Sequence, residues 1–179
     1  MDIYNMLKKE IRRYIYDQNW QQFTKIQTHS IKLYNESKDN LILIAPTASG
    51  KTEAAFLPAI NSIKNWEEGV KIVYISPLIA LINDQFNRIS ELCKYMEITV
   101  TRWHGEASQS KKRSILKNPK GILLITPESL EALFVTKSDR VKKLFYSVEN
   151  IIAIIEAKLG KMNKVEKDEN NFDDEIEVF

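Results

Sequence analysis

Cysteine, glycine and proline are all scarce in this chain of 179 residues, and each scarcity excludes a class of protein. The single cysteine, Cys93, excludes an intramolecular disulfide and a cysteine-based zinc site. Five glycines and five prolines are too few for a collagen-like or linker-like chain. The longest apolar runs, such as residues 41–45 and 151–155, fall far short of the roughly 18 residues that cross a bilayer. Because no secretory signal is visible either, we expect a soluble, cytoplasmic protein with no membrane partner.

Positive and negative side chains are unevenly distributed along the sequence. The formal net charge is +2, but residues 1–165 hold 25 basic and 17 acidic side chains, whereas residues 166–179 hold 1 and 7. A basic body attracts phosphate backbones, although a solvated, lysine-rich surface accounts for the same excess. The acidic end predicts a disordered tail.

Short apolar runs alternate with amphipathic segments over most of the chain. Helices are predicted over residues 2–17 and 24–34 from apolar residues that recur at helical spacing. Strands of about five residues separated by helices of about ten predict an α/β fold, a parallel sheet with helices on both faces. The expected strands are 41–45, 71–76, 98–103, 121–126 and 150–155, and the expected helices between them are 51–63, 78–96, 108–117, 128–135 and 139–146.

Three of the expected strands end in a loop with proline, at residues 45–46, 76–77 and 126–127. Proline just past a strand ends the hydrogen-bond ladder. Ligands of parallel sheets bind beyond the carboxyl ends of the strands. We therefore expect the three loops to lie together at one edge of the sheet.

The strongest single signal is A-P-T-A-S-G-K-T at residues 45–52, which follows an apolar strand and opens a helix, the context of a phosphate-binding loop. Small residues let the backbone wrap a phosphate, and the N–H groups of a helix N-terminus favour negative charge. Lys51 is expected to reach the β- and γ-phosphates, and the Thr52 hydroxyl to hold Mg²⁺. The other expected nucleotide contacts are Pro46, Thr47, Ala48, Ser49 and Gly50.

Two alanines depart from the glycine-rich pattern of such loops. Ala45 stands at the first position of the motif, and Ala48 at a position where many loops have glycine. A methyl group is tolerated there if the local φ is negative. Upstream, Gln27 ends the segment F-T-K-I-Q, and its carboxamide offers the donor and acceptor that the edge of adenine requires. Taken alone, Gln27 is an ordinary exposed helix residue.

These segments, in this order, resemble the superfamily 2 DExD/H-box helicases, and most of all their Lhr-like branch. The resemblance runs from about residue 23 to 149 and implies a RecA-like first lobe that binds ATP with Mg²⁺ and one strand of DNA or RNA. Residues 23–27 resemble the adenine-reading Q-type segment, 45–55 motif I, 74–89 motif Ia with its helix, 101–105 (T-R-W-H-G) a segment that often touches the nucleic-acid backbone, and 126–130 (T-P-E-S-L) motif Ib.

The resemblance implies backbone contacts to nucleic acid from Pro77, Leu78, His104, Gly105, Thr126, Pro127 and Glu128. Plainer explanations exist for some of them. A single histidine such as His104 is more often a satisfied core residue. The carboxylate of Glu128 repels phosphate, so helix capping explains that residue at least as well.

The resemblance breaks where motif II is due. The family places an Asp-Glu pair, then x-His, at the end of the strand that follows motif Ib, whereas residues 150–158 read N-I-I-A-I-I-E-A-K. An ungapped alignment puts Ile154 and Ile155 at the two acids, and one deletion leaves Glu156 alone as the candidate catalytic base. Loss of one acid–base group typically costs on the order of 10²–10⁴ in rate. We therefore expect little or no autonomous ATPase or unwinding activity.

Three segments follow from this interpretation: an N-terminal helix at residues 1–22, an incomplete RecA-like lobe at 23–156, and a charged tail at 157–179. No motif III or second lobe is seen after Glu156, so a separate chain is a candidate source of the second lobe. Two alternatives stay open. One is a non-catalytic nucleic-acid-binding module, and the other is a P-loop kinase or GTPase, which explains G-K-T but neither residues 74–89 nor 126–130.

Overall fold

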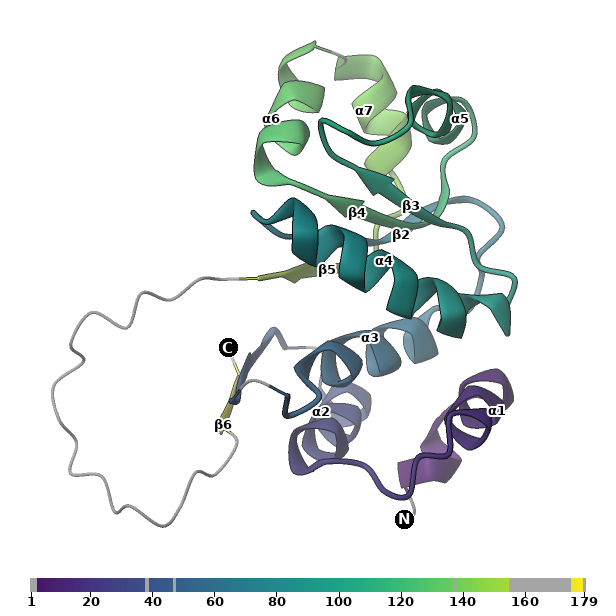
Figure 1. The fold of residues 1–179 in the computed structure, drawn as a ribbon, viewed down its shortest axis with the longest axis vertical. Helices are drawn as coiled ribbons and strands as arrows, with labels where there is room; N and C mark the ends of the chain where they lie inside the picture. Colours follow the sequence, from purple (N-terminus) through teal and green to yellow (C-terminus); the bar gives the residue numbers. More distant parts are fainter. Residues whose placement is uncertain (1–2, 38, 47, 137, 155–174, 179) are drawn as a thin grey trace, which may run out of the picture.

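The computed structural model describes residues 3–37, 39–46, 48–136, 138–154 and 175–178. Within these residues, the main sheet has four parallel strands in the order β3-β4-β2-β5 (Figure 1). These strands are β2 (Gly69–Ile75), β3 (Val100–Trp103), β4 (Lys120–Ile125) and β5 (Asn150–Ala153). The expected α/β architecture with a parallel sheet is confirmed.

Helices cover both faces of this sheet, as expected (Figure 1). The helices are α1 (Lys9–Asp17), α2 (Lys25–Glu36), α3 (Lys51–Ser62) and α4 (Ile79–Lys94) on one side, and α5 (Gln109–Lys117), α6 (Pro127–Thr136) and α7 (Ser138–Phe145) on the other. Among the described residues, no helix combines the length and the apolar character needed to cross a membrane.

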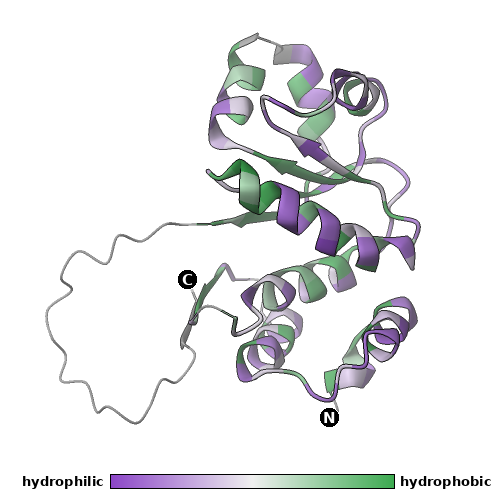
Figure 2. Ribbon diagram, in the orientation of Figure 1, coloured by the Kyte–Doolittle hydropathy of each residue, from purple (hydrophilic) through white to green (hydrophobic). Residues whose placement is uncertain are grey.

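The central strand β4 shows how the sheet separates two cores. Ile122 and Leu124 pack into the core beneath α3 and α4, whereas Leu123 and Ile125 pack into the core beneath α5, α6 and α7. All four side chains are fully buried. A strand buried on both faces needs a continuous apolar run rather than alternation, and Figure 2 shows this hydrophobic centre between helices with polar outer surfaces.

The N-terminal segment shares the core beneath α3 and α4. The single helix expected over residues 2–17 is divided into a 3₁₀ helix, η1 (Ile3–Met6), and α1. The division is fixed by Asn61 of α3, whose side chain accepts a hydrogen bond from the Lys8 backbone N–H (2.8 Å) and donates one to the Met6 carbonyl (3.0 Å). Ile11 and Ile15 of α1 are buried in the core that α3 and α4 cover. Residues 1–22 therefore include part of the lobe's packing.

The strand before the phosphate loop lies outside the main sheet, contrary to expectation. Strand β1 (Leu41–Ile44) pairs antiparallel with β6 (Glu175–Val178), from Leu41↔Val178 to Ile44↔Glu175. Figure 1 shows the pair apart from the four-stranded sheet. A four-residue apolar strand fits either sheet, and its sequence does not encode which edge it meets. Residues 157–174 and 179 of the expected tail lie outside the described residues, whereas 175–178 form a strand.

Candidate functional site

The phosphate loop joins β1 to α3, and Gly50 is the residue directly before the helix. Gly50 has φ +89° and stands at the N-cap of α3. A Cβ added there would lie 2.4 Å from Nε2 of Gln27, so both conformation and space require glycine. No side-chain cap is present at this end of α3. The first amides of the helix are therefore available to an anion.

Ala48 departs from the sequence-based expectation. Its φ is +64°, in the left-handed region, rather than negative as tolerance of the methyl group would require. The left-handed conformation costs an L-residue about 1–2 kcal/mol. The loop thus holds a strained residue two positions before Gly50. Its neighbour Thr47 lies outside the described residues.

Lys51 folds back over its own loop. Its ammonium donates hydrogen bonds to the carbonyl oxygens of Ala45 and Pro46. The Ser49 hydroxyl is buried and has no hydrogen-bond partner within the described residues. Thr52 is half-buried in the first turn of α3. An orphaned hydroxyl beside a lysine that is held only by carbonyls fits a phosphate group, whose oxygens accept hydrogen bonds from both.

Gln27 is not the exposed helix residue that its position alone predicts. Only 4% of it is exposed, and it forms a capping box with Thr24 at the start of α2. Its Oε1 accepts from the Thr24 backbone N–H (3.0 Å), and its Nε2 donates to the Gly50 carbonyl (3.4 Å). The start of α2 is therefore attached to the phosphate loop through this side chain.

A cavity of about 340 Å³ lies beside the start of α2. It is lined by Ile3, Tyr4, Ile15, Trp20, Gln21, Gln22, Phe23 and Thr28. The Trp20 and Phe23 rings meet edge to face, with centroids 6.2 Å apart. Tyr4 and Trp20 were not candidates from the sequence. The signal that could have found Trp20 is its position three residues before Phe23 of the Q-type segment, whereas nothing near that segment points to Tyr4.

The loops after β2, β3 and β4 come together at the carboxyl edge of the sheet. The parallel register places Ile75 beside Ile125 and Trp103 beside Ile125. The two proline loops at residues 76–77 and 126–127 therefore meet as expected. The loop at 45–46 does not extend from this sheet, because β1 pairs elsewhere.

His104 follows β3 at this edge, and its side chain is buried. It is 3% exposed, and neither ring nitrogen has a hydrogen-bond partner within the described residues. Burial, and then the nearby positive charge of Arg102, lower the pKa of this histidine. His104 is thus neutral at pH 7. The next residue, Gly105, is exposed, and no described atom would lie within 4 Å of an added Cβ.

Thr126 is the cap of α6, a role that the sequence interpretation gave to Glu128. The Thr126 hydroxyl accepts from the Ser129 backbone N–H (3.3 Å) and donates to the Ser129 hydroxyl (3.0 Å). Pro127 begins the helix, and Glu128 is exposed in its first turn, where a carboxylate is favourable. The T-P-E-S pattern is itself a helix-start signal. In the loop after β2, Pro77 and Leu78 are exposed, Leu78 by 48%.

An isoleucine, Ile154, directly follows β5, where the resemblance would require acids. The Ile154 backbone N–H donates to the Ile75 carbonyl (2.9 Å), which places Ile154 at the carboxyl edge of the sheet. Its side chain is 42% exposed. Glu156 lies outside the described residues. In the part of the chain that is described, no three His, Cys, Asp or Glu side chains gather in a way that could hold a metal ion.

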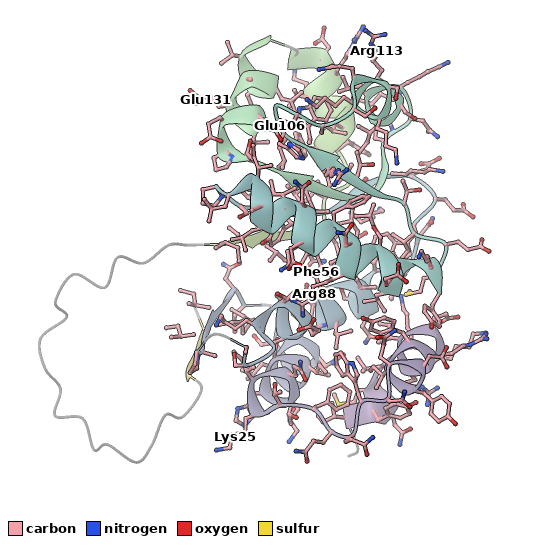
Figure 3. All side chains as sticks on the ribbon, viewed as in Figure 1. Lys25, Phe56, Arg88, Glu106, Arg113 and Glu131 are labelled. Atoms are coloured by element: carbon pink, nitrogen blue, oxygen red, sulfur yellow. The ribbon has the colours of Figure 1, made fainter. Side chains whose placement is uncertain are left out.

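An ion pair joins α3, which begins at the phosphate loop, to α4, which begins after the loop that follows β2. Arg88 of α4 contacts Glu53 of α3, which follows Thr52 directly, and also Asp84 one turn earlier. Figure 3 marks Arg88 where α4 lies against α3. The Glu53 side chain is 16% exposed, so the pair is better shielded than most surface pairs. The phosphate loop and the loop after β2 are therefore connected by two helices that are bound to each other.

The comparison with family models decides the classification. A model of the DEAD/DEAH box helicase family matches residues 24–155. The chain belongs to this family. The resemblance to the DExD/H-box helicases is thereby confirmed.

Relatives of this DEAD/DEAH box chain include the "ATP-dependent helicase Lhr-Core" of Methanocaldococcus jannaschii, 34% identical over 147 residues, which are 72% of this chain and 17% of the relative. The structure of Mycobacterium smegmatis helicase Lhr bound to ssDNA and AMP-PNP is similar over 86% of this chain and 21% of that chain, with 28% identity and a TM-score of 0.72. The DEAD-box helicase Mss116 bound to ssRNA and UDP-BeF shares the fold, with 22% identity and a TM-score of 0.71. The chain spans about a fifth of the length of its Lhr relatives.

Proposed function

We propose that this DEAD/DEAH box lobe binds ATP with Mg²⁺ through its phosphate loop. The observation that carries the proposal is the junction of the loop and α3. There Gly50 is left-handed, the helix has no side-chain cap, and the Ser49 hydroxyl has no hydrogen-bond partner in the described part of the chain. Lys51 would exchange the carbonyls of Ala45 and Pro46 for phosphate oxygens, and the Thr52 hydroxyl would hold the metal. Bound Mg²⁺ would neutralise charge on the phosphates.

The base of the nucleotide is proposed to lie near the start of α2. Gln27 would release the Gly50 carbonyl and use its carboxamide to recognise the edge of adenine. Phe23 and Trp20 line the neighbouring cavity and offer aromatic faces for stacking. The cavity volume is in the range of small-molecule sites, about 300–1,000 Å³.

One strand of DNA or RNA is proposed to cross the carboxyl edge of the four-stranded sheet. The proposed contacts are Pro77, Leu78, His104, Gly105, Thr126, Pro127 and Glu128. The adjacency of the three loops supports this proposal, since loop amides and helix N-termini bind phosphates without reading bases. The Thr126 hydroxyl is engaged as a cap, so its contribution would be positional. The relative from M. smegmatis was solved with ssDNA and AMP-PNP.

Autonomous ATP hydrolysis and unwinding are proposed to be absent or very slow. Ile154 offers no carboxylate at the end of β5 to anchor a metal or to activate water. Glu156 remains a candidate base. A helicase cycle also needs a second lobe that closes over the nucleotide. The non-catalytic nucleic-acid-binding module is thus the nearest alternative.

Calorimetric titration with Mg·ATP tests the nucleotide site. We expect binding heat for the wild type at about millimolar ligand, a weak affinity worth about 4 kcal/mol, and loss of that heat in Lys51→Ala. Lys64→Ala is the matched control, because Lys64 is an exposed lysine beyond the end of α3. A folded wild type that releases no heat would contradict the proposal.

A phosphate-release assay with and without single-stranded DNA tests turnover. We expect no stimulation by DNA. Stimulated release that disappears in Lys51→Ala would instead show a working catalytic centre. Nucleic-acid binding is tested separately by a gel-shift salt series, in which affinity should fall steeply as salt rises.

A further inference from the structure

Strand β1 has one edge occupied by a segment from the far end of the chain. All four of its residues are aligned with β6, from Glu175 to Val178. The strand is nonetheless poorly covered: Ile42 is 37% exposed and Ile44 is 48% exposed. An apolar strand of this composition is typical of a sheet that is buried on both faces. The β1–β6 pair therefore leaves β1 without the packing that its sequence suits.

Strand β5, in turn, lacks a neighbouring strand on one side among the described residues. It is the last strand of the order β3-β4-β2-β5, so one of its edges is open within the described residues. Ile151 is 67% exposed and Ile154 is 42% exposed beside that edge. An open, apolar edge strand is a template for pairing with another strand.

The two strands are already attached to the same helices. Helix α3 contacts both β1 and β5, and α2 contacts β1. The Tyr34 hydroxyl of α2 donates a hydrogen bond to the Asn150 side chain at the start of β5. Because β1, α3 and β2 are consecutive, a crossover through α3 would bring β1 into the sheet parallel to its other strands.

We propose that β6 occupies the edge of β1 that would otherwise pair with β5, so that the two strands compete for β1 and β6 controls the phosphate loop. While β6 is paired, β1 and its loop are held outside the parallel sheet, and Lys51 binds the carbonyls of its own loop. When β6 leaves, β1 pairs with the open edge of β5. The phosphate loop then reaches the carboxyl edge of the sheet, beside Ile154, the residue that follows β5. The C-terminal strand is thus an intramolecular inhibitor of nucleotide binding; this consequence rests on the proposed function, whereas the competition between strands does not.

A reversible cross-link tests the competition in the full chain. Ile42 and Glu177 are directly opposed in the β1–β6 ladder, and opposed residues have Cβ atoms about 4.5–5.5 Å apart. The variant Ile42→Cys/Glu177→Cys should therefore form a disulfide, and buried Cys93 should not interfere. The control Ile42→Cys/Ile176→Cys is out of register by one residue, which places the thiols on opposite faces. It should form little cross-link.

The oxidised in-register variant should bind Mg·ATP about tenfold more weakly than the same protein after reduction, a usual size for coupling between sites. Equal affinities before and after reduction would overturn the inhibitory role. Equal cross-linking in the two variants would overturn the β1–β6 register on which the proposal stands.

A second measurement does not depend on nucleotide binding. In a variant that ends at residue 174, the amides of β5 should exchange with deuterium more slowly than in the full chain, because β1 would then cover the open edge. Unchanged or faster exchange in β5 would overturn the competition between strands. If the strands behave as proposed but no form of the protein binds Mg·ATP, then the proposed function fails and the competition stands.

Discussion

The four-stranded parallel sheet and strand β1 are built from similar apolar sequence, yet they differ in burial. In β4, residues from Ile122 to Ile125 are fully buried, with a core on each face. In β1, every second residue is exposed. The difference teaches that an apolar run specifies a strand, whereas the connections around it specify its partner. Strands β2 to β5 follow one another through single helices or a pair of helices, whereas β1 meets a strand from the distant end of the chain.

The same difference separates the two proposed binding regions. The proposed nucleic-acid loops extend from the buried sheet, which fixes them relative to one another. The phosphate loop extends from the smaller pair and contains a strained residue, Ala48, and a lysine bound to its own loop. We therefore expect mutations of the buried strand residues beneath the first region to lower stability. Mutations in the second region should mainly affect nucleotide binding, with a cost in stability where the backbone is left-handed.

The largest expected effect tests where stability resides. Ile122→Ala in β4 should lower the free energy of unfolding by about 2–5 kcal/mol, because it removes a fully buried side chain from the core. The matched change Ile44→Ala in β1 should cost much less, because Ile44 is 48% exposed. Urea denaturation measures both. Similar costs would show that the β1–β6 pair is as tightly packed as the main sheet.

Alanine substitutions at two glycines compare the phosphate loop with the proposed nucleic-acid edge. Gly50→Ala should destabilise the protein by about 1–2 kcal/mol, the cost of a left-handed L-residue. It should also abolish Mg·ATP binding, because the methyl group would displace Gln27. Gly105→Ala should be nearly silent in urea denaturation, since its φ is not positive and its Cβ would meet no described atom. If Gly105→Ala lost stability and Gly50→Ala did not, then glycine would be required at Gly105 rather than in the phosphate loop.

The sequence predicts the main sheet well and the phosphate-loop region less well. The helix expected over residues 108–117 is observed at Gln109–Lys117, because helical periodicity is a local property of the sequence. The partner of β1 and the interruption before α1 were not predictable, since both depend on residues distant in sequence, β6 and Asn61. The expected strand-to-helix junction at residues 45–52 is observed between β1 and α3, whereas its phosphate-binding role stays a prediction. The φ of Ala48 and the carbonyl contacts of Lys51 were missed, because they depend on packing around the loop rather than on residue type.

The buried histidine makes the nucleic-acid edge sensitive to pH. The folded state holds the pKa of His104 below its ordinary value of 6.5, so the unfolded chain takes up a proton first as the pH falls. The free energy of unfolding should therefore decrease below about pH 6.5, by no more than about 1.4 kcal/mol per pH unit for one proton. Thermal or urea unfolding at several pH values measures this slope.

His104→Asn should reduce that slope. His29→Asn, a change at an exposed histidine of α2, should keep it. If the pH dependence of the free energy of unfolding is unaltered in His104→Asn, then other groups cause it. The edge that holds His104 would then be no more sensitive to pH than the phosphate-loop region.

The smallest expected effect concerns the strain at Ala48. Ala48→Gly should relieve the cost of the left-handed φ, about 1–2 kcal/mol. The greater freedom of glycine in the unfolded chain offsets about 0.4–1 kcal/mol of that gain, so the net stabilisation should be slight. The same change at Ala55, inside α3, should instead destabilise by about 1 kcal/mol. Changes of opposite sign in the free energy of unfolding, measured by urea denaturation, would place the strain in the loop. A loss of stability in both variants would mean that Ala48 is not strained. The contrast between the two regions would then rest on burial alone.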